Sequence, residues 1–195
     1  YSLELLLNGK KIYEHNVEKF SFAESKYINL LIDYKHYKKH RQRLQKCFIE
    51  PNNKLSIYDK QFPELGFIEV ADGMEYTAEI IAKDLNGNQT KLTIPIVGKI
   101  NPITLPITEK KTDYPIIATD FNKFSRDGVT VAFPKNTFYK DFYLDFKVNV
   151  DGSAYIHKPT VPLNNSYTLT FKVSKYTAKE RKHLFIASYN YKNKP

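Results

Sequence analysis

The feature that most constrains this chain is a succession of short runs rich in β-branched and aromatic residues, separated by Gly, Asn, Asp or Pro. Such runs are typical of strands, and their close spacing favours antiparallel sandwiches. Strand and helix patterns hardly alternate, which argues against a doubly wound nucleotide-binding fold. We predict strands over residues 27–32, 47–50, 54–58, 66–70, 74–82, 90–97, 129–133, 142–150, 154–157 and 167–173.

Both ends of the sequence also have strand patterns. Apolar residues alternate over residues 1–7, and Asn8-Gly9 then predicts a two-residue hairpin turn with a return strand over residues 11–17. Residues 184–191 have a strand-like composition and are followed by a turn-like Asn-Lys-Pro ending. We therefore expect this sequence to be a fragment of a longer protein.

A tyrosine follows the turn before the predicted hairpin of residues 74–82 and 90–97. Asp72-Gly73 forms the turn, and Tyr76 comes three residues after the glycine. This is the arrangement of a tyrosine corner, in which the Tyr hydroxyl ties down a strand connection of a sandwich domain. Pro95 fits best near an edge or at the end of its strand, because proline cannot donate a ladder hydrogen bond.

The chain divides at residues 99–115, where three prolines among polar residues predict an extended linker. We predict an all-β protein with two immunoglobulin-like or fibronectin-like antiparallel sandwich domains. Residues 1–98 form the first domain, with N-terminal strands expected upstream, and residues 116–195 form the second, which we expect to be truncated.

One segment departs from the β pattern and predicts a short amphipathic helix over residues 33–46, lying on the first domain. Apolar and aromatic side chains recur there at steps of three or four, and Asp33 stands at the N-cap position. Its exposed surface carries Lys35, Lys38, Lys39, Arg41, Arg43 and Lys46, with His36 and His40 and no acid.

The basic helix is the main candidate for a functional feature. The chain has 30 Lys and Arg against 21 Asp and Glu, a net charge of +9, and six of these cations lie in this segment. One interpretation is an anion-binding site for a phosphate, an acidic glycan, a lipid headgroup or an acidic partner. The other is a solvated helix face that serves solubility. A nucleic-acid partner is disfavoured, since no recognised nucleic-acid-binding fold accompanies the basic residues.

The sequence contains no motif that predicts an active site, a cofactor site or a metal site. His36 and His40 have ligand spacing on a helix, but six cations surround them and disfavour a divalent ion. Cys47 cannot form an internal disulfide, being the only cysteine, and we expect it to be a small buried apolar residue. Asp72 and Asp84 could contribute to a Ca²⁺ loop, although turn chemistry explains them more simply.

Four runs of the sequence resemble the region downstream of the catalytic domain in lysostaphin/LytM-type zinc metallo-endopeptidases. They are residues 1–15, 20–29, 45–56 and 76–98, and the Gln45–Ser56 run is the most specific. The similarity is to secreted members from Gram-negative bacteria with a long β-rich C-terminal extension. Members of that family cleave peptidoglycan cross-bridges, with zinc held by an H-x-x-x-D pair and an H-x-H pair that have no counterpart here.

The resemblance implies an accessory region whose parent would hold the zinc in a separate catalytic domain, and it implies periplasmic residence, with association to the outer membrane as an option. Two hypotheses remain. The chain is either the non-catalytic part of a peptidoglycan metallo-endopeptidase or a structural subunit of a cell-envelope assembly derived from a peptidase-like parent. Its partner would be an envelope protein or peptidoglycan. No apolar run approaches the roughly 18 residues of a transmembrane helix.

Overall fold

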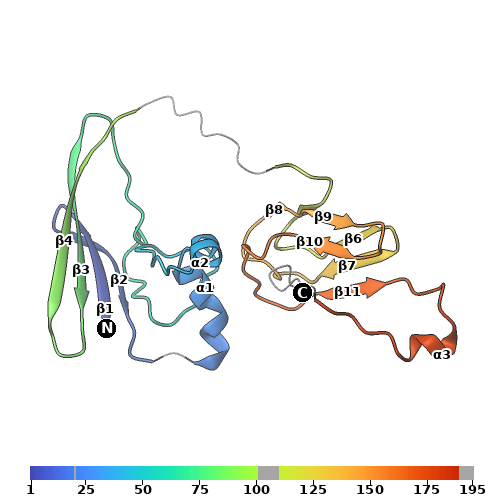
Figure 1. The fold of residues 1–195 in the computed structure, drawn as a ribbon. Helices are drawn as coiled ribbons and strands as arrows, with labels where there is room; N and C mark the ends of the chain where they lie inside the picture. Colours follow the sequence, from blue (N-terminus) through green and yellow to red (C-terminus); the bar gives the residue numbers. More distant parts are fainter. Residues whose placement is uncertain (20, 101–109, 189–195) are drawn as a thin grey trace.

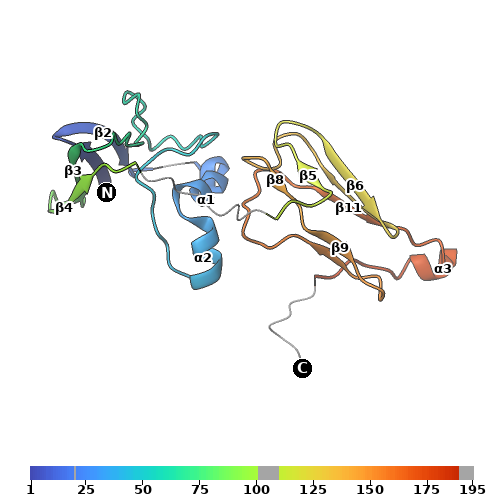
Figure 2. The ribbon, with the colours of Figure 1, turned by 90° about the horizontal axis from the view of Figure 1, so that it is seen from above.

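A computed structural model describes residues 1–19, 21–100 and 110–188, and it confirms the all-β prediction, with several antiparallel sheets and short helices (Figures 1 and 2). The N-terminal strands are β1 (Ser2–Leu7), β2 (Lys10–Asn16), β3 (Glu75–Lys83) and β4 (Gln89–Val97). The later strands are β5 (Pro115–Ile116), β6 (Asn122–Arg126), β7 (Val129–Phe133), β8 (Phe142–Tyr143), β9 (Phe146–Val148), β10 (Ala154–Ile156) and β11 (Thr168–Phe171). Most of the predicted linker, residues 101–109, lies outside the described residues.

The four N-terminal strands form one antiparallel sheet in the order β2-β1-β3-β4. Asn8 and Gly9 connect β1 to β2 with φ angles of 50° and 79°, so the predicted two-residue turn is confirmed. β3 and β4 pair over their whole length, from Glu75 opposite Val97 to Lys83 opposite Gln89. The predicted hairpin of residues 74–82 and 90–97 is therefore confirmed to within one residue at each end.

The two faces of this sheet differ in chemistry. The inner face contributes Leu5, Tyr13 and Ala78 to the N-terminal hydrophobic core. On the outer face, the Glu4 carboxylate lies 2.6 Å from Lys83 Nζ and 3.1 Å from Lys11 Nζ. Burial opposes the charge on Glu4, but the two lysines outweigh it and lower the pKa of the carboxyl. The outer face is thus held by ion pairs, and the inner face by apolar packing.

Residues 27–31 and 47–58 pack against the inner face as helical and irregular segments, where the sequence predicted strands. A 3₁₀ helix, η1 (Phe22–Tyr27), leads into α1 (Ile28–Leu31), so the strand predicted over residues 27–32 is wrong. Three consecutive residues at its end, Leu30 to Ile32, are buried, and such a short apolar run does not distinguish a strand from a buried helix.

The strands predicted over residues 47–50, 54–58 and 66–70 are also wrong, and residues 57–66 instead close the edge of β2 at isolated points. Asn16 N donates to Ile57 O at 2.9 Å, and Gly66 N donates to Ile12 O at 2.9 Å. Gly66 has φ +86°, which is not a strand conformation, and a Cβ there would lie 2.2 Å from Cys47 O. A residue with a side chain therefore does not fit at this position.

The predicted tyrosine corner contact is present. Ala71 N donates a hydrogen bond to the Tyr76 hydroxyl at 3.0 Å, across the turn that leads into β3. The same turn is tied to the end of β4, because Gly98 N donates to Met74 O at 2.8 Å. Together these bonds fix where the β3–β4 hairpin leaves the rest of the unit.

The C-terminal residues form three small sheets around a second, separate core. Their strand orders are β11-β7-β6, β10-β9 and β5-β8. β7 alternates buried Val129, Val131 and Phe133 with half-buried residues, as its sequence pattern predicted. α3 (Ala178–Arg181) forms one short helical turn after β11. The strand expected from residue 184 is not formed over residues 184–188, and its remaining residues lie outside the described residues.

A small contact joins the two units around Tyr139. The Tyr139 hydroxyl donates to Lys26 O at 3.3 Å, its carbonyl accepts from Asn52 Nδ2 at 3.0 Å, and its ring meets Tyr27 edge-on at 6.0 Å. Lys26 Nζ also donates to Asn164 O at 3.5 Å. Both views show α1 and α2 between the N-terminal sheet and the C-terminal strands (Figures 1 and 2).

Candidate functional site

The basic segment begins as a helix but is shorter than the sequence predicted. α2 (Tyr34–His40) starts at Asp33, whose carboxylate accepts a hydrogen bond from His36 N at 2.8 Å. It ends at Arg41, which has a left-handed φ of 62°. Arg43 and Lys46 therefore lie beyond the helix, and the predicted extent to residue 46 is wrong. The left-handed turn was not foreseen because no glycine or asparagine marks it.

Five of the six predicted cations are free of ion pairs within the described part of the chain. They are Lys35, Lys38, Lys39, Arg41 and Arg43. The sixth, Lys46, is used inside the fold: its Nζ lies 2.6 Å from Glu50 Oε1 and 5.6 Å from the Phe48 ring. We name the five free cations, with Tyr34 and Tyr37, the basic surface.

Aromatic rings position part of this basic surface. Lys38 Nζ lies 5.9 Å from the Tyr34 ring centroid, and the Arg43 guanidinium lies 5.6 Å from that of Tyr37. Cation–π contacts of this kind restrict long side chains while leaving their charge available to an anion. The α2 helix projects from the N-terminal unit in Figure 2.

His36 and His40 lie on the same helix with ring centroids 4.5 Å apart. His36 Nε2 is 3.0 Å from Gln42 Oε1, so one ring nitrogen already has a side-chain partner. Among the described residues, no group of three or more His, Cys, Asp or Glu side chains could hold a metal ion. The pair therefore adds further polar groups beside the basic surface.

A buried polar network fixes the chain where it leaves the basic surface. His15 Nδ1 lies 2.9 Å from the Tyr13 hydroxyl, and Gln45 Nε2 lies 2.9 Å from His15 Nε2. Tyr1 closes the network by donating from its hydroxyl to Gln45 Oε1 at 3.3 Å. Burial, followed by the charge of the N-terminal amine, lowers the pKa of His15 to about 4. The sequence did not reveal this role for His15, because its partners are far apart along the chain.

Cys47 is half-buried and packs against the N-terminal core rather than facing a site. Burial raises the pKa of its thiol, which disfavours the reactive thiolate. The two turn aspartates also have structural partners: Asp84 accepts from the backbone N–H groups of Asn86 and Asn88, and Asp72 accepts from Ile100 N at 2.7 Å. The Asp84 contacts match the turn chemistry that the sequence indicated, whereas the Asp72 contact joins its turn to the residues that follow β4.

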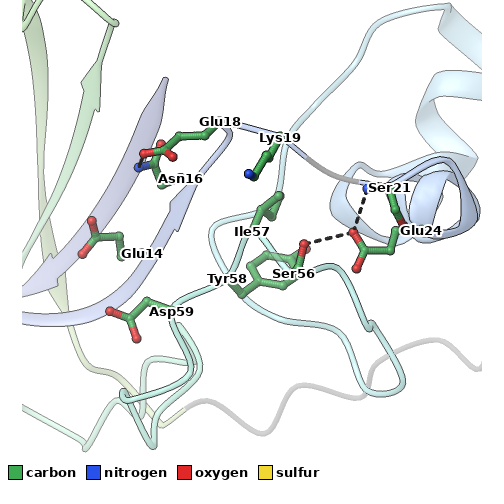
Figure 3. A pocket seen from close by; sticks show the side chains of 10 residues that line it. All are labelled: Glu14, Asn16, Glu18, Lys19, Ser21, Glu24, Ser56, Ile57, Tyr58 and Asp59. Atoms are coloured by element: carbon green, nitrogen blue, oxygen red, sulfur yellow. Dashed lines mark hydrogen bonds between the residues drawn. The ribbon is translucent and has the colours of Figure 1, made fainter.

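A pocket of about 740 Å³ opens between β2 and the segment at residues 56–59 (Figure 3). Its carboxylates are largely engaged: Glu24 accepts from Ser21 N and Ser56 Oγ, and Glu14 lies 2.8 Å from Lys11 Nζ. The pocket is lined by Glu14, Asn16, Glu18, Lys19, Ser21, Glu24, Ser56, Ile57, Tyr58 and Asp59. Within this lining, Glu24 joins η1 to the segment at residues 56–59, whereas Glu14 is paired inside β2.

Sequence reasoning missed one surface, which lies along β4. Apart from Ile96, its residues are exposed, including Leu92 and Ile94. The alternating apolar pattern and Pro95 indicated a strand near an edge, but only the sheet order shows which edge has no neighbouring strand among residues 1–19, 21–100 and 110–188.

Comparison with known proteins gives a family only for the C-terminal part. Residues 114–195 match the family model of the Zu5-like domain, beginning one residue before β5. No significant match to the chain is found among curated proteins or solved structures. In the described part of the chain, no helix is both long and apolar enough to cross a membrane. The C-terminal unit is therefore similar to a Zu5-like domain.

Proposed function

We propose that this chain is a non-catalytic interaction region of a cell-envelope protein, and that its basic surface binds an acidic partner. The observation that carries the proposal is the clustering, within residues 35–43, of five cations that have no ion-pair partner in the described part of the chain, and this segment contains no acid. In the N-terminal sheet, by contrast, Lys11, Lys83 and Lys91 each lie within 3.1 Å of a glutamate carboxylate. Unpaired, pre-positioned cations attract a negatively charged partner at little cost in ordering.

The non-catalytic part of the proposal is supported by the structural use of residues that could otherwise do chemistry. His15 is fully buried within a hydrogen-bonded network, and Cys47 packs against the core. His157 Nδ1 accepts a hydrogen bond from Asp145 N at 3.1 Å, and its ring packs against Phe142. Each of these side chains has a role in holding the fold.

The envelope setting is supported by the resemblance to zinc metallo-endopeptidase extensions, of which the Gln45–Ser56 run is the most specific part. Two parents fit that resemblance: a scaffold subunit of an envelope assembly, or an active peptidoglycan endopeptidase that carries this region as an accessory. The sequence upstream decides between them. Intact H-x-x-x-D and H-x-H pairs there would favour the peptidase, and their loss would favour the scaffold.

The binding proposal is tested by reversing charge on the basic surface. Lys35, Lys38, Lys39 and Arg43 are changed to Glu together, while Arg41 is kept because its left-handed backbone ends α2. Binding to immobilised poly-L-glutamate and to purified peptidoglycan sacculi is measured at two salt concentrations. We expect affinity for the acidic polymer to fall about tenfold or more, since each exposed charge contributes up to about 1 kcal/mol.

A matched control carries the same change in net charge at four dispersed, exposed lysines: Lys54, Lys123, Lys140 and Lys158. This control should keep its affinity within about twofold. Equal losses in both variants would mean that only the net charge of +9 matters, and no loss in either would remove the basic surface as a binding site. Retained binding to sacculi with lost binding to poly-glutamate would indicate a protein partner.

A further inference from the structure

The N-terminal sheet has one covered edge and one free edge. The outer edge of β2 is closed by residues 57–66, through a bridge between His15 and Tyr58 and a hydrogen bond from Asp59 N to Glu14 O. β4 forms the other edge, and within the described part of the chain it pairs only with β3 (Figures 1 and 2). A free edge strand of this length can accept another strand.

The hydrogen-bond phase identifies which backbone groups of β4 point outward. At the two ends of the hairpin, Asp84 N donates to Asn88 O and Gly98 N donates to Met74 O. Hydrogen-bonded pairs alternate along an antiparallel ladder, so the even-numbered residues from 88 to 98 bond to β3. The odd-numbered residues direct their N–H and C=O groups to the free side. Pro95 stands at one of these outward positions, where its missing N–H costs the sheet nothing.

The inner face of β4 is apolar and uncovered. Leu92 lies opposite Ile80 and Ile94 opposite Ala78, so both share the face that forms the core. Leu92 is nevertheless 56% exposed and Ile94 37% exposed. The sheet thus ends with unburied apolar side chains beside unpaired backbone groups.

We propose that β4 pairs antiparallel with β4 of a second copy of this chain, with Thr93 on the two-fold axis. In this register the outward residues meet each other: Thr93 faces Thr93, Lys91 faces Pro95, and Gln89 faces Val97 of the other copy. Every outward N–H donates to a carbonyl of the other copy, and Pro95 is the one outward residue of β4 that has no N–H to donate. On the inner face, Leu92 of each copy lies opposite Ile94 of the other, at the close spacing of a pair without hydrogen bonds.

Charge and proline disfavour the registers centred on Lys91 and on Pro95. Centring the pair on Lys91 would place like charges directly opposite each other, which is destabilising. Centring it on Pro95 would bring the two positions without an N–H together and place Leu92 opposite Gly98. The register centred on Thr93 makes Leu92 and Ile94 cover each other while keeping the two Lys91 side chains apart, and it differs from the registers centred on Leu92 or on Ile94 in placing Thr93 directly opposite Thr93. The strand is therefore self-complementary, as an isologous interface requires.

The test reads the register by cross-linking. Thr93→Cys is introduced into a chain in which Cys47 is changed to Ala, and the protein is oxidised under mild conditions at about 100 µM. Hydrogen-bonded antiparallel pairs place their Cα atoms about 5.5 Å apart, within the range of a disulfide. Thr90→Cys in the same background is the matched control, because the two copies of residue 90 would be about 20 Å apart. We expect rapid disulfide-linked dimer from the first variant only.

Equilibrium sedimentation of the unaltered chain gives the second readout. An interface of one strand pair is small, so we expect a weak dimer whose population rises with protein concentration. Thr93→Pro removes an outward N–H without touching the β3 ladder and should make the chain monomeric, whereas Thr93→Val should not. Monomeric protein at about 500 µM, or equal cross-linking through residues 90 and 93, would overturn the proposal.

Discussion

At the scale of single residues, the protonation state of His15 is set by its neighbours. Gln45 Oε1 accepts from Tyr1, so the Gln45 amide nitrogen faces His15 Nε2 as a donor. That leaves the imidazole proton on Nδ1, directed at the Tyr13 hydroxyl, which in turn donates to Lys46 O at 3.3 Å. The network is complete with a neutral ring and has no acceptor for a second proton.

The first prediction is that the free energy of unfolding falls as pH decreases from about 6.5 to 4. The pKa of His15 is about 4 in the folded chain against an ordinary value of 6.5, so the unfolded chain binds more protons in this window. Protonation then favours unfolding, by up to about 3 kcal/mol at 1.36 kcal/mol per unit. Urea unfolding at pH 7, 5.5 and 4 measures the slope.

His15→Gln should be less stable at pH 7 but should lose most of that slope, while His183→Gln, at an exposed position, should retain it. An unchanged slope in His15→Gln would assign the pH dependence to other groups.

At the scale of elements, the sequence predicted correctly the turns and strands that depend on interactions between residues close together in the chain. The Asn8-Gly9 turn, β7 and the β3–β4 hairpin follow from turn residues and alternation, and all three form as expected. Residues 54–58 have the composition of a strand, yet in the described structure they meet β2 only near an isolated bridge between His15 and Tyr58, a long-range contact that the local sequence does not reveal. The cations of the basic surface were predicted, whereas the end of α2 at Arg41 and the free edge of β4 depend on backbone geometry and sheet order.

The second prediction concerns the start of α2. Asp33→Ala should destabilise the chain by about 1 kcal/mol, because the His36 N–H loses the carboxylate that accepts its hydrogen bond. Asp33→Asn keeps an acceptor and should cost only a few tenths of a kcal/mol. The denaturant midpoints of the two variants provide the measurement. An equal loss in both would attribute the effect to the negative charge at the helix start rather than to the cap bond.

At the scale of the whole molecule, the chain contains two separate hydrophobic cores. Leu55 belongs to the N-terminal core and Leu144 to the C-terminal core, and each is 1% exposed. The contact around Tyr139 joins the units through a few hydrogen bonds and one ring pair. Burial of Tyr139 there raises the pKa of its hydroxyl to about 12, so this hydroxyl stays protonated at physiological pH.

The third prediction is that the two cores unfold as separate transitions in calorimetry. Leu55→Ala and Leu144→Ala should each destabilise one transition by about 2–5 kcal/mol and leave the other nearly unchanged. The two leucines are matched in residue type and in burial, so the comparison isolates the location of the change. If both variants shifted one common transition, the Tyr139 contact would have to couple the units far more strongly than its few bonds suggest.

The narrowness of the Tyr139 contact has a consequence for how such a sequence can diverge. Substitutions inside one core meet no side chain of the other, so each unit can drift, be replaced or be recombined on its own. Compensating changes between the units should be confined to the positions that touch, namely Lys26, Tyr27 and Asn52 on one side and Tyr139 and Asn164 on the other.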